Sequence, residues 1–300
     1  MNAIEIKNLS KSFRGMYAVD HLDMTVPQGA IYGFIGENGS GKSTTEKLIC
    51  GHLVPDGGEI RLFGRDYTDP GVRVRVGALI ENAGCFPGSS VYQNLMMQCI
   101  NLGIENADEE IRRVLCIVRM EDNANLKFKS CSLGMKQRIG IAMALLGDPA
   151  LLILDEPING LDTDGMRIMR EILVDITQKY GCIVLISSHI LGELEKIATH
   201  YGIIRQGRMI AELSAEEMDS RAQVFVSLKA KDMMAVKAVL EGSFTNVREE
   251  GEYIRVYDVD DTAEVVDHLM KKGHAVSEIR RNKIGLEEYY VELMSRKGTE

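Results

Sequence analysis

Apolar and polar residues alternate at the start of the chain, with the two-residue period that is typical of half-buried strands. The alternation covers residues 4–9 and returns over 22–26, before a turn at 27–29. A short apolar run, 30–35, follows this turn and leads into a glycine-rich segment. We expect an N-terminal antiparallel β part, followed by the first strand of a larger sheet.

Farther along the chain, helical stretches alternate with strands that are apolar throughout. The pattern is helical from 91 to about 147 and again over 165–179, whereas 150–154 and 182–186 are continuous apolar runs. Such runs are typical of parallel strands that are buried on both faces of a sheet. The alternation predicts an α/β domain with a mainly parallel core sheet, and it places a helical subdomain at about 84–147.

The pattern changes after about residue 218. Strands and helices then follow in the order β-α-β-β-α-β, and a last helix is expected over 285–294. This order is typical of the ferredoxin-like α+β fold. We therefore expect two domains: a larger α/β domain over 1–215 and a small α+β domain over 220–300.

Composition and charge indicate which classes of partner, nucleic acid or membrane, the chain can bind directly. Of the 300 residues, 45% are hydrophobic and 26% charged, as in an ordinary globular protein, and 44 acidic against 35 basic residues give a net charge of −9. That balance argues against nucleic acid as the main partner. The longest uncharged stretch, 82–104, is interrupted by Pro87 and Gly88 and cannot span a bilayer. Work at a membrane would therefore require a partner that holds the chain there.

The cysteines and the N-terminus indicate a reducing compartment. The six cysteines are widely spaced and form no CxxC pair, which excludes a zinc knuckle and a small disulfide framework. We expect them to be reduced core thiols of a cytosolic protein. The first eleven residues, with charges at Glu5 and Lys7, do not resemble a signal peptide.

The glycine-rich segment satisfies the pattern GxxxxGKS/T between a strand and a helix. Glycines let the backbone curl so that successive N–H groups point at phosphate oxygens, and the helix N-terminus adds a partial positive charge. Lys42 supplies a full charge to the β- and γ-phosphates, and the Ser43 hydroxyl can ligate Mg²⁺. Glu46, farther into the helix, is expected to be solvated. The predicted nucleotide-binding residues here are Gly36, Glu37, Asn38, Gly39, Ser40, Gly41, Lys42, Ser43 and Thr44.

Two acidic residues follow the apolar run 151–154. The C-terminal edge of a parallel sheet is the side on which ligands bind. Asp155 is therefore a candidate to hold Mg²⁺ directly or through water, and Glu156 is a candidate to polarise the attacking water of a hydrolysis. A solvated turn is the plain alternative, but the phosphate loop in the same chain favours the functional interpretation.

A third segment, residues 131–138, reads CSLGMKQR and lies about twenty residues before the acidic strand. It resembles the LSGGQ signature, followed by a basic residue and QR, of the ATP-binding subunits of ABC transporters. The match keeps Ser132, Gly134, Gln137 and Arg138. A serine hydroxyl and glycine N–H groups at the start of a helix make an anion site. In the family this site faces the γ-phosphate on the opposite subunit, which implies a head-to-tail homodimer with two ATP molecules at its interface.

Other elements of the same family follow in the expected order. Residues 159–162 resemble the D-loop, which crosses the dimer interface, and His189 resembles the switch histidine that contacts the γ-phosphate. Phe13 resembles the aromatic residue that stacks on adenine. Residues 77–84 resemble the Q-loop, with Glu81 where most members have glutamine. A carboxylate there can still ligate Mg²⁺.

The resemblance implies an ATPase that uses ATP and Mg²⁺, dimerises on ATP and drives a separate membrane permease. The chain would then be cytoplasmic and attached to the inner face of the cell membrane through that permease. Ser132 and Gly134 would close over the γ-phosphate of the other subunit. The implied catalytic residues are Lys42, Glu156 and His189, and the implied metal ligands are Ser43, Asp155 and Glu81.

The Q-loop and signature segments together resemble one branch of the family, which includes bacitracin-export and lantibiotic-immunity ATPases. This branch implies export of peptide antibiotics or bacteriocins. A soluble ABC-type ATPase not tied to transport is the alternative, but such proteins usually carry two cassettes or a long coiled coil, and this chain has one phosphate loop and no heptad run. A regulatory cassette that does not hydrolyse ATP would be expected to lose Glu156 or His189, and both are present.

Overall fold

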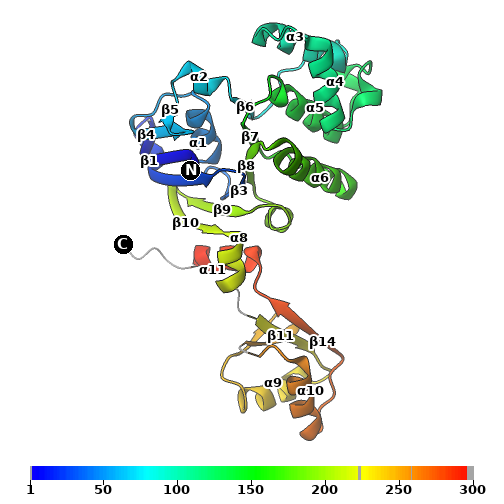
Figure 1. Ribbon diagram of the computed structural model, residues 1–300. Coiled ribbons are helices and arrows are strands. Elements are labelled where there is room, and N and C mark those ends of the chain that lie inside the picture. Colours follow the sequence, from blue (N-terminus) through cyan, green and yellow to red (C-terminus); the bar gives the residue numbers. More distant parts are fainter. Residues whose placement is uncertain (1, 222–223, 258, 296–300) are drawn as a thin grey trace. The chain divides into compact units, whose positions relative to one another are not determined.

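The computed structural model describes residues 2–221, 224–257 and 259–295. The chain divides into two compact units, one that ends at Ala215 and one that begins at Glu216, and each is described by itself (Figure 1).

An antiparallel sheet, in the order β2-β1-β4-β5, opens the first unit. The apolar residues of the predicted alternation, such as Ile4, Ile6 and Leu22, point into the core and are fully buried or nearly so. Ile4 lies opposite Val26 on one side and Leu62 on the other, so the sheet presents a continuous apolar face. Its strands are β1 (Asn2–Phe13), β2 (Met16–Pro27), β4 (Gly57–Leu62) and β5 (Arg65–Asp66).

The central sheet has the order β10-β9-β3-β8-β7-β6. Its strands are parallel except for β10, which pairs with β9 in the antiparallel sense, and this confirms the predicted α/β class. Every residue of β3 and β8 is buried, as their continuous apolar sequences predict. The strands are β3 (Ile31–Ile35), β6 (Val76–Leu79), β7 (Leu151–Asp155), β8 (Ile183–Ser188), β9 (His200–Arg205) and β10 (Arg208–Ser214).

Helix α1 (Lys42–Ile49) joins the two sheets, because its Leu48 and Ile49 belong to the same buried cluster as residues of both. The helical subdomain lies beside β6 and β7 (Figure 1) and packs on them mainly through α5. The remaining helices of the unit are α2 (Pro70–Arg73), α3 (Val91–Leu102), α4 (Ala107–Ile117), η1 (Glu121–Asn123), η2 (Phe128–Ser130), α5 (Leu133–Leu145), α6 (Thr163–Tyr180) and α7 (Leu191–Leu194).

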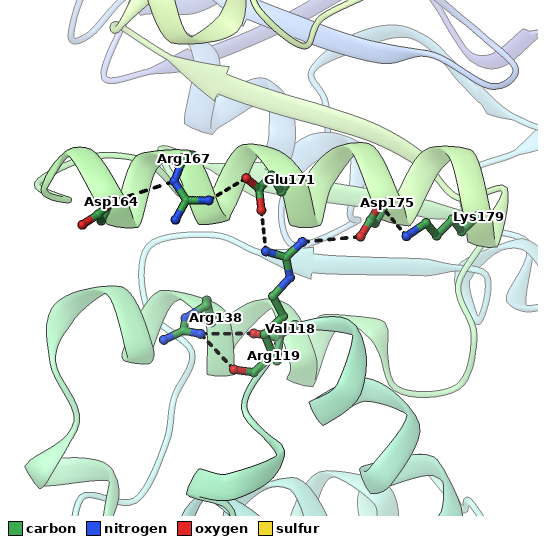
Figure 2. A network of polar contacts seen from close by, with 8 residues as sticks. All are labelled: Val118, Arg119, Arg138, Asp164, Arg167, Glu171, Asp175 and Lys179. Atoms are coloured by element: carbon green, nitrogen blue, oxygen red, sulfur yellow. Dashed lines mark hydrogen bonds and ion pairs between the residues drawn. The ribbon is translucent and has the colours of Figure 1, made fainter.

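A polar network ties the helical subdomain to α6 (Figure 2). Arg119, just beyond the end of α4, bonds Glu171 at 2.5 Å and lies 3.6 Å from Asp175, one turn farther along α6. Arg138 of α5 donates to the carbonyl oxygens of Val118 and Arg119, at 3.4 and 3.0 Å. The guanidinium of Arg138 therefore supports the backbone from which Arg119 reaches α6.

The second unit is a four-stranded antiparallel sheet in the order β12-β13-β11-β14. Two helices, α9 and α10, cover one face around a buried cluster that includes Val226, Leu228 and Ile254 (Figure 1). This confirms the predicted ferredoxin-like arrangement. The elements are α8 (Ala215–Arg221), β11 (Val224–Lys229), α9 (Met233–Glu241), β12 (Val247–Glu250), β13 (Tyr253–Tyr257), α10 (Thr262–Lys271), β14 (Glu278–Lys283) and α11 (Leu286–Ser295).

The cysteines carry free thiols throughout the described part of the chain. Cys99, Cys131 and Cys182 are buried, as expected, but Cys116 on α4 is exposed, so the expectation of core thiols is wrong for this residue. Among the residues described, no helix combines the length and the apolar character that crossing a membrane requires.

Candidate nucleotide site

Three neighbouring strands bring the predicted site residues to one edge of the central sheet. β3 leads into the phosphate loop, β7 ends at Asp155, and β8, which lies between them, ends at Ser188 just before His189. The register places Asp155 opposite Ser187 and Ile35 opposite Ser188. All three segments therefore meet at the C-terminal edge of the sheet, where α/β proteins bind ligands.

The phosphate loop has the backbone that its glycines predict. Gly41 takes φ +111° as the N-cap of α1, a conformation that side chains disfavour, and a Cβ there would lie 2.4 Å from the carbonyl oxygen of Ala18. A Cβ on Gly36 would lie 2.5 Å from the Ser40 hydroxyl. The N-cap has no side-chain hydrogen bond, so the first N–H groups of α1 remain available to an anion.

Lys42 and Ser40 complete a donor set that fits phosphate. Lys42 is buried and its Nζ donates to the carbonyl oxygens of Gly36 and Glu37, at 2.7 and 3.1 Å. The ammonium group thus lies over the loop itself. The Ser40 hydroxyl is buried and has no hydrogen-bond partner among the described residues. A lysine, a serine hydroxyl and an uncapped helix N-terminus together provide what a polyphosphate requires.

Two of the three predicted metal ligands lie together. The Ser43 hydroxyl donates to Asp155 Oδ2 at 2.9 Å, and the Ser187 hydroxyl donates to Asp155 Oδ1 at 2.9 Å. A hydroxyl and a carboxylate beside a phosphate loop are oxygen donors of the kind that Mg²⁺ prefers. Glu81 instead accepts a hydrogen bond from Lys47 Nζ at 2.6 Å, and this exposed ion pair lowers the pKa of Glu81. Its predicted metal contact therefore stays a prediction.

Glu156 and His189 form a pair. The Nδ1 atom of His189 lies 2.7 Å from Glu156 Oε2, while Glu156 Oε1 is buried and has no hydrogen-bond partner among the described residues. The Glu156 N–H donates to both the carbonyl and the hydroxyl of Ser187, at 3.2 Å each. His189 thus orients one carboxylate oxygen of Glu156, and the predicted role of Glu156 toward water stays a prediction.

The signature segment begins helix α5 as predicted. Ser132 is the N-cap and accepts a hydrogen bond from the N–H of Met135 at 3.3 Å. A Cβ on Gly134 would lie 3.6 Å from the Leu161 side chain of the predicted D-loop, so the two segments lie side by side. A cavity of about 430 Å³ is lined by both. Phe13, at the end of β1, is 46% exposed, and its predicted contact with adenine stays a prediction.

The chain is similar to known proteins. The family described as ABC transporter matches residues 19–159. The chain is 34% identical over 298 residues to the uncharacterized ABC transporter ATP-binding protein YcbN of Bacillus subtilis (strain 168), and the match covers 97% of each chain. The values are the same for the bacitracin transport ATP-binding protein BcrA of Bacillus licheniformis. The chain is an ABC transporter ATP-binding protein.

Solved structures agree with this ABC ATPase fold. The structure of cbiO1 from Clostridium perfringens superimposes with a TM-score of 0.67 at 25% identity, over 73% of this chain and 91% of that one. A dimeric cassette in a post-hydrolysis state, bound to ADP and Pi, gives 0.64 at 21% identity. ABC ATPases couple hydrolysis of ATP to transport, and this is the activity of the family to which the chain belongs.

Two residues of this ABC ATPase site were missed or misjudged from the sequence. The Ser187 hydroxyl bonds both the Asp155 carboxylate and the backbone N–H of Glu156. Its place at the end of an apolar strand, directly before Ser188, could have indicated that it belongs to the site. Glu46 was expected to be solvated, and this is wrong, because its side chain is fully buried. Its spacing of three from Ser43 places both residues on one side of α1, which could have indicated burial.

Proposed function

We propose that the chain is the ATP-hydrolysing subunit of an exporter of peptide antibiotics of the bacitracin kind. The observation that carries the proposal is the length of the similarity. The bacitracin transport ATP-binding proteins of Bacillus licheniformis and Enterococcus faecalis match 97% and 98% of the chain. The lantibiotic transport ATP-binding protein SrtF of Streptococcus pyogenes matches 74% of it, although 95% of that protein is covered.

Hydrolysis would depend on the residues at the edge of the central sheet. Lys42 and the N–H groups of the phosphate loop would bind the β- and γ-phosphates of ATP. Glu156 would orient the attacking water and accept its proton at Oε1, while His189 holds Oε2. Bound Mg²⁺ would neutralise charge on the phosphates, with Ser43 and Asp155 as its protein ligands. Glu81 would have to leave Lys47 to join them.

The site would be completed by a second copy of the chain. Ser132 and its neighbour Leu133 are exposed at the N-terminus of α5, where a helix start favours an anion. Ser132 and Gly134 would close over the γ-phosphate held by the other subunit and exclude water other than the nucleophile. Each of the two sites would then contain residues of both chains.

A membrane permease would be the remaining partner. Large apolar side chains are exposed on the helical subdomain: Phe86 is 59%, Ile100 is 69% and Leu102 is 50% exposed. Exposed apolar groups on a charged surface are typical of a protein interface. Contact with a permease through this subdomain would hold the chain at the inner face of the cell membrane.

Bacitracin susceptibility of the source cells tests the proposal. Deletion of the gene should lower the bacitracin concentration that stops growth, and the wild-type gene should restore it, whereas Glu156→Gln should not. A cell-wall antibiotic of unrelated structure serves as the control, since general damage would alter both responses. If deletion leaves bacitracin susceptibility unchanged, the substrate part of the proposal fails. If Glu156→Gln restores resistance fully, the role of Glu156 fails.

A further inference from the structure

The second unit contains a cavity that lies outside the predicted nucleotide site. Its volume is about 480 Å³, which is in the range of small-molecule sites. Strands β12 and β13 form one wall, and α11, with Ile284 just before it, forms the other. The lining residues of β13 alternate with Ile254 and Val256 of the buried cluster, so the cavity lies on the face of the sheet opposite to α9 and α10. The matched ABC transporter model ends at residue 159, well before this unit begins.

The strand wall has an uncompensated positive charge. Arg248 and Arg255 lie directly opposite each other in the register of β12 and β13, an arrangement of like charges that destabilises a sheet. Glu250 pairs with Arg255 at 2.8 Å. Arg248 takes part in no ion pair among the described residues, and its guanidinium lies 5.1 Å from the centre of the Tyr257 ring. An anionic group at Arg248 would therefore offset the charge of this wall.

The helix wall has the opposite charge. Glu287, Glu288 and Glu292 line it, and Glu288 and Glu292 are one turn apart, a spacing at which like charges destabilise a helix. The helix dipole favours the two acidic residues of the first turn, but not Glu292 beyond it. Glu287 takes part in no ion pair within the described part of the chain. Val291, which is 64% exposed, adds apolar surface to this wall.

The cavity separates the two sets of charges, and its aromatic side is fixed in advance. No ion pair of the described residues joins the strand wall to α11, although Arg248 and Glu287 are both without one. Tyr257 is only 6% exposed, its hydroxyl donates to Glu250 at 3.1 Å, and its ring lies 5.3 Å from that of Phe225. Groups that are held in place before a ligand arrives cost less entropy when it binds.

We propose that this cavity binds a small zwitterion with an apolar body, of which a dipeptide with apolar side chains is the simplest example. The carboxylate of the ligand pairs with Arg248, its ammonium group pairs with Glu287, and its apolar body lies against Val291 and the Tyr257 ring. A ligand with one charge would offset one wall and be repelled by the other. The site is separate from the nucleotide site, and the inference does not depend on the proposed function.

Three matched ligands test which charges are recognised. Calorimetric titration of the full chain compares leucyl-leucine with isocaproyl-leucine, which lacks the ammonium group, and with leucyl-leucinamide, which lacks the carboxylate. We expect each analogue to bind about tenfold more weakly than leucyl-leucine, because each loses one charge-assisted hydrogen bond. The inference is overturned if leucyl-leucine does not bind at millimolar concentration, or if either analogue binds as tightly.

Two substitutions assign the charges to the walls. Arg248→Gln should weaken binding of leucyl-leucine about tenfold and leave that of leucyl-leucinamide unchanged, since the amide has no carboxylate to pair. Glu287→Gln should weaken leucyl-leucine and leave isocaproyl-leucine unchanged. Arg281→Gln and Glu264→Gln are the controls, because these exposed residues of the same unit do not line the cavity, and both should bind as the wild type does. Loss of binding in the controls, or wild-type binding in Arg248→Gln, would contradict the assignment.

Val291→Trp tests the location without changing any charge. The larger side chain should fill the cavity and abolish binding of leucyl-leucine. Arg248, Glu287 and Val291 are all exposed, so we expect the unfolding midpoint of each variant to stay close to that of the wild type. Wild-type binding by folded Val291→Trp would show that the ligand binds elsewhere, and the inference would fail.

Discussion

Lys42 is the only full positive charge that we place on the nucleotide phosphates within one subunit. It is buried and bonded to the carbonyl oxygens of Gly36 and Glu37, so its ammonium group is already held over the loop. We expect Lys42→Ala to weaken ATP binding at least about tenfold, or about 1.4 kcal/mol, because the N–H groups of the loop supply only partial positive charge. Equilibrium binding of a fluorescent ATP analogue to the wild type and to Lys42→Ala measures this loss of affinity. Wild-type affinity in the folded variant would contradict the assignment.

Glu46 makes stability depend on pH in a defined direction. Its pKa rises from an ordinary value of 4.5 to about 8 on folding, so the unfolded chain ionises first as the pH increases. The contribution of the protonated carboxyl is complete below about pH 4.5 and is lost between there and pH 8, at up to about 1.4 kcal/mol for each pH unit. We expect wild type to lose more unfolding free energy than Glu46→Gln between pH 5 and 8.

Urea unfolding without metal or nucleotide measures this difference, and equal losses would show that Glu46 is not the group responsible.

The residues of the site differ in how far the sequence alone predicts their positions. The phosphate loop and Asp155-Glu156 were predicted because the spacing of the motif determines their positions. The burial of Glu46 and the bond between Glu81 and Lys47 depend on side chains from distant segments, which no local pattern indicates.

At the scale of elements, α6 and the helical subdomain are joined through Arg119 (Figure 2). Its partners Glu171 and Asp175 are one turn apart on α6, which itself begins beside the predicted D-loop. Arg119 is 42% exposed, and each such ion pair contributes about 0.2–1 kcal/mol. We expect Arg119→Ala to lower global stability little while it increases amide hydrogen exchange in the 107–117 helix.

Arg167→Ala is the matched control, because Arg167 pairs only with Asp164 and Glu171 of the same helix among the contacts drawn in Figure 2. It should leave exchange over 107–117 unchanged. Hydrogen exchange with mass spectrometry compares the two variants. An equal increase in both would mean that the loss of a positive charge beside Glu171, and not the link to the subdomain, is responsible.

Elements were predicted well where one periodicity dominates. The apolar runs that became β7 and β8 could be identified because strands buried on both faces contain few polar residues. The breaks within the helical pattern from 91 to about 147 were not predicted, and in the structure this stretch is divided among α3, α4 and α5, with η1 and η2 between α4 and α5. The order of the strands in the central sheet could not be predicted from the sequence. β3 lies between β8 and β9, and the hydrophobic pattern of a strand does not indicate which distant strands pair with it.

At the scale of the whole molecule, each unit has its own buried core. All the predicted nucleotide-site residues belong to the first unit, which ends at Ala215. We therefore expect a chain that stops after Ala215 to fold and to bind ATP, with an affinity close to that of the full chain. Calorimetric titration with ATP analogues and a thermal melt test this. An aggregated product, or loss of binding by a folded one, would show that the second unit is required.

The strand register at the site also determines which insertions and deletions the gene can tolerate. Asp155 and Ser187 lie opposite each other across β7 and β8, and Ser188 lies opposite Ile35 of β3. Removal of one codon within β8 would move every following side chain to the other face of the sheet and turn Ser187 away from Asp155. The same deletion in the exposed turn at 251–252 would leave that pairing intact. Length variation among functional descendants of this gene should therefore be found in turns and absent from these three strands.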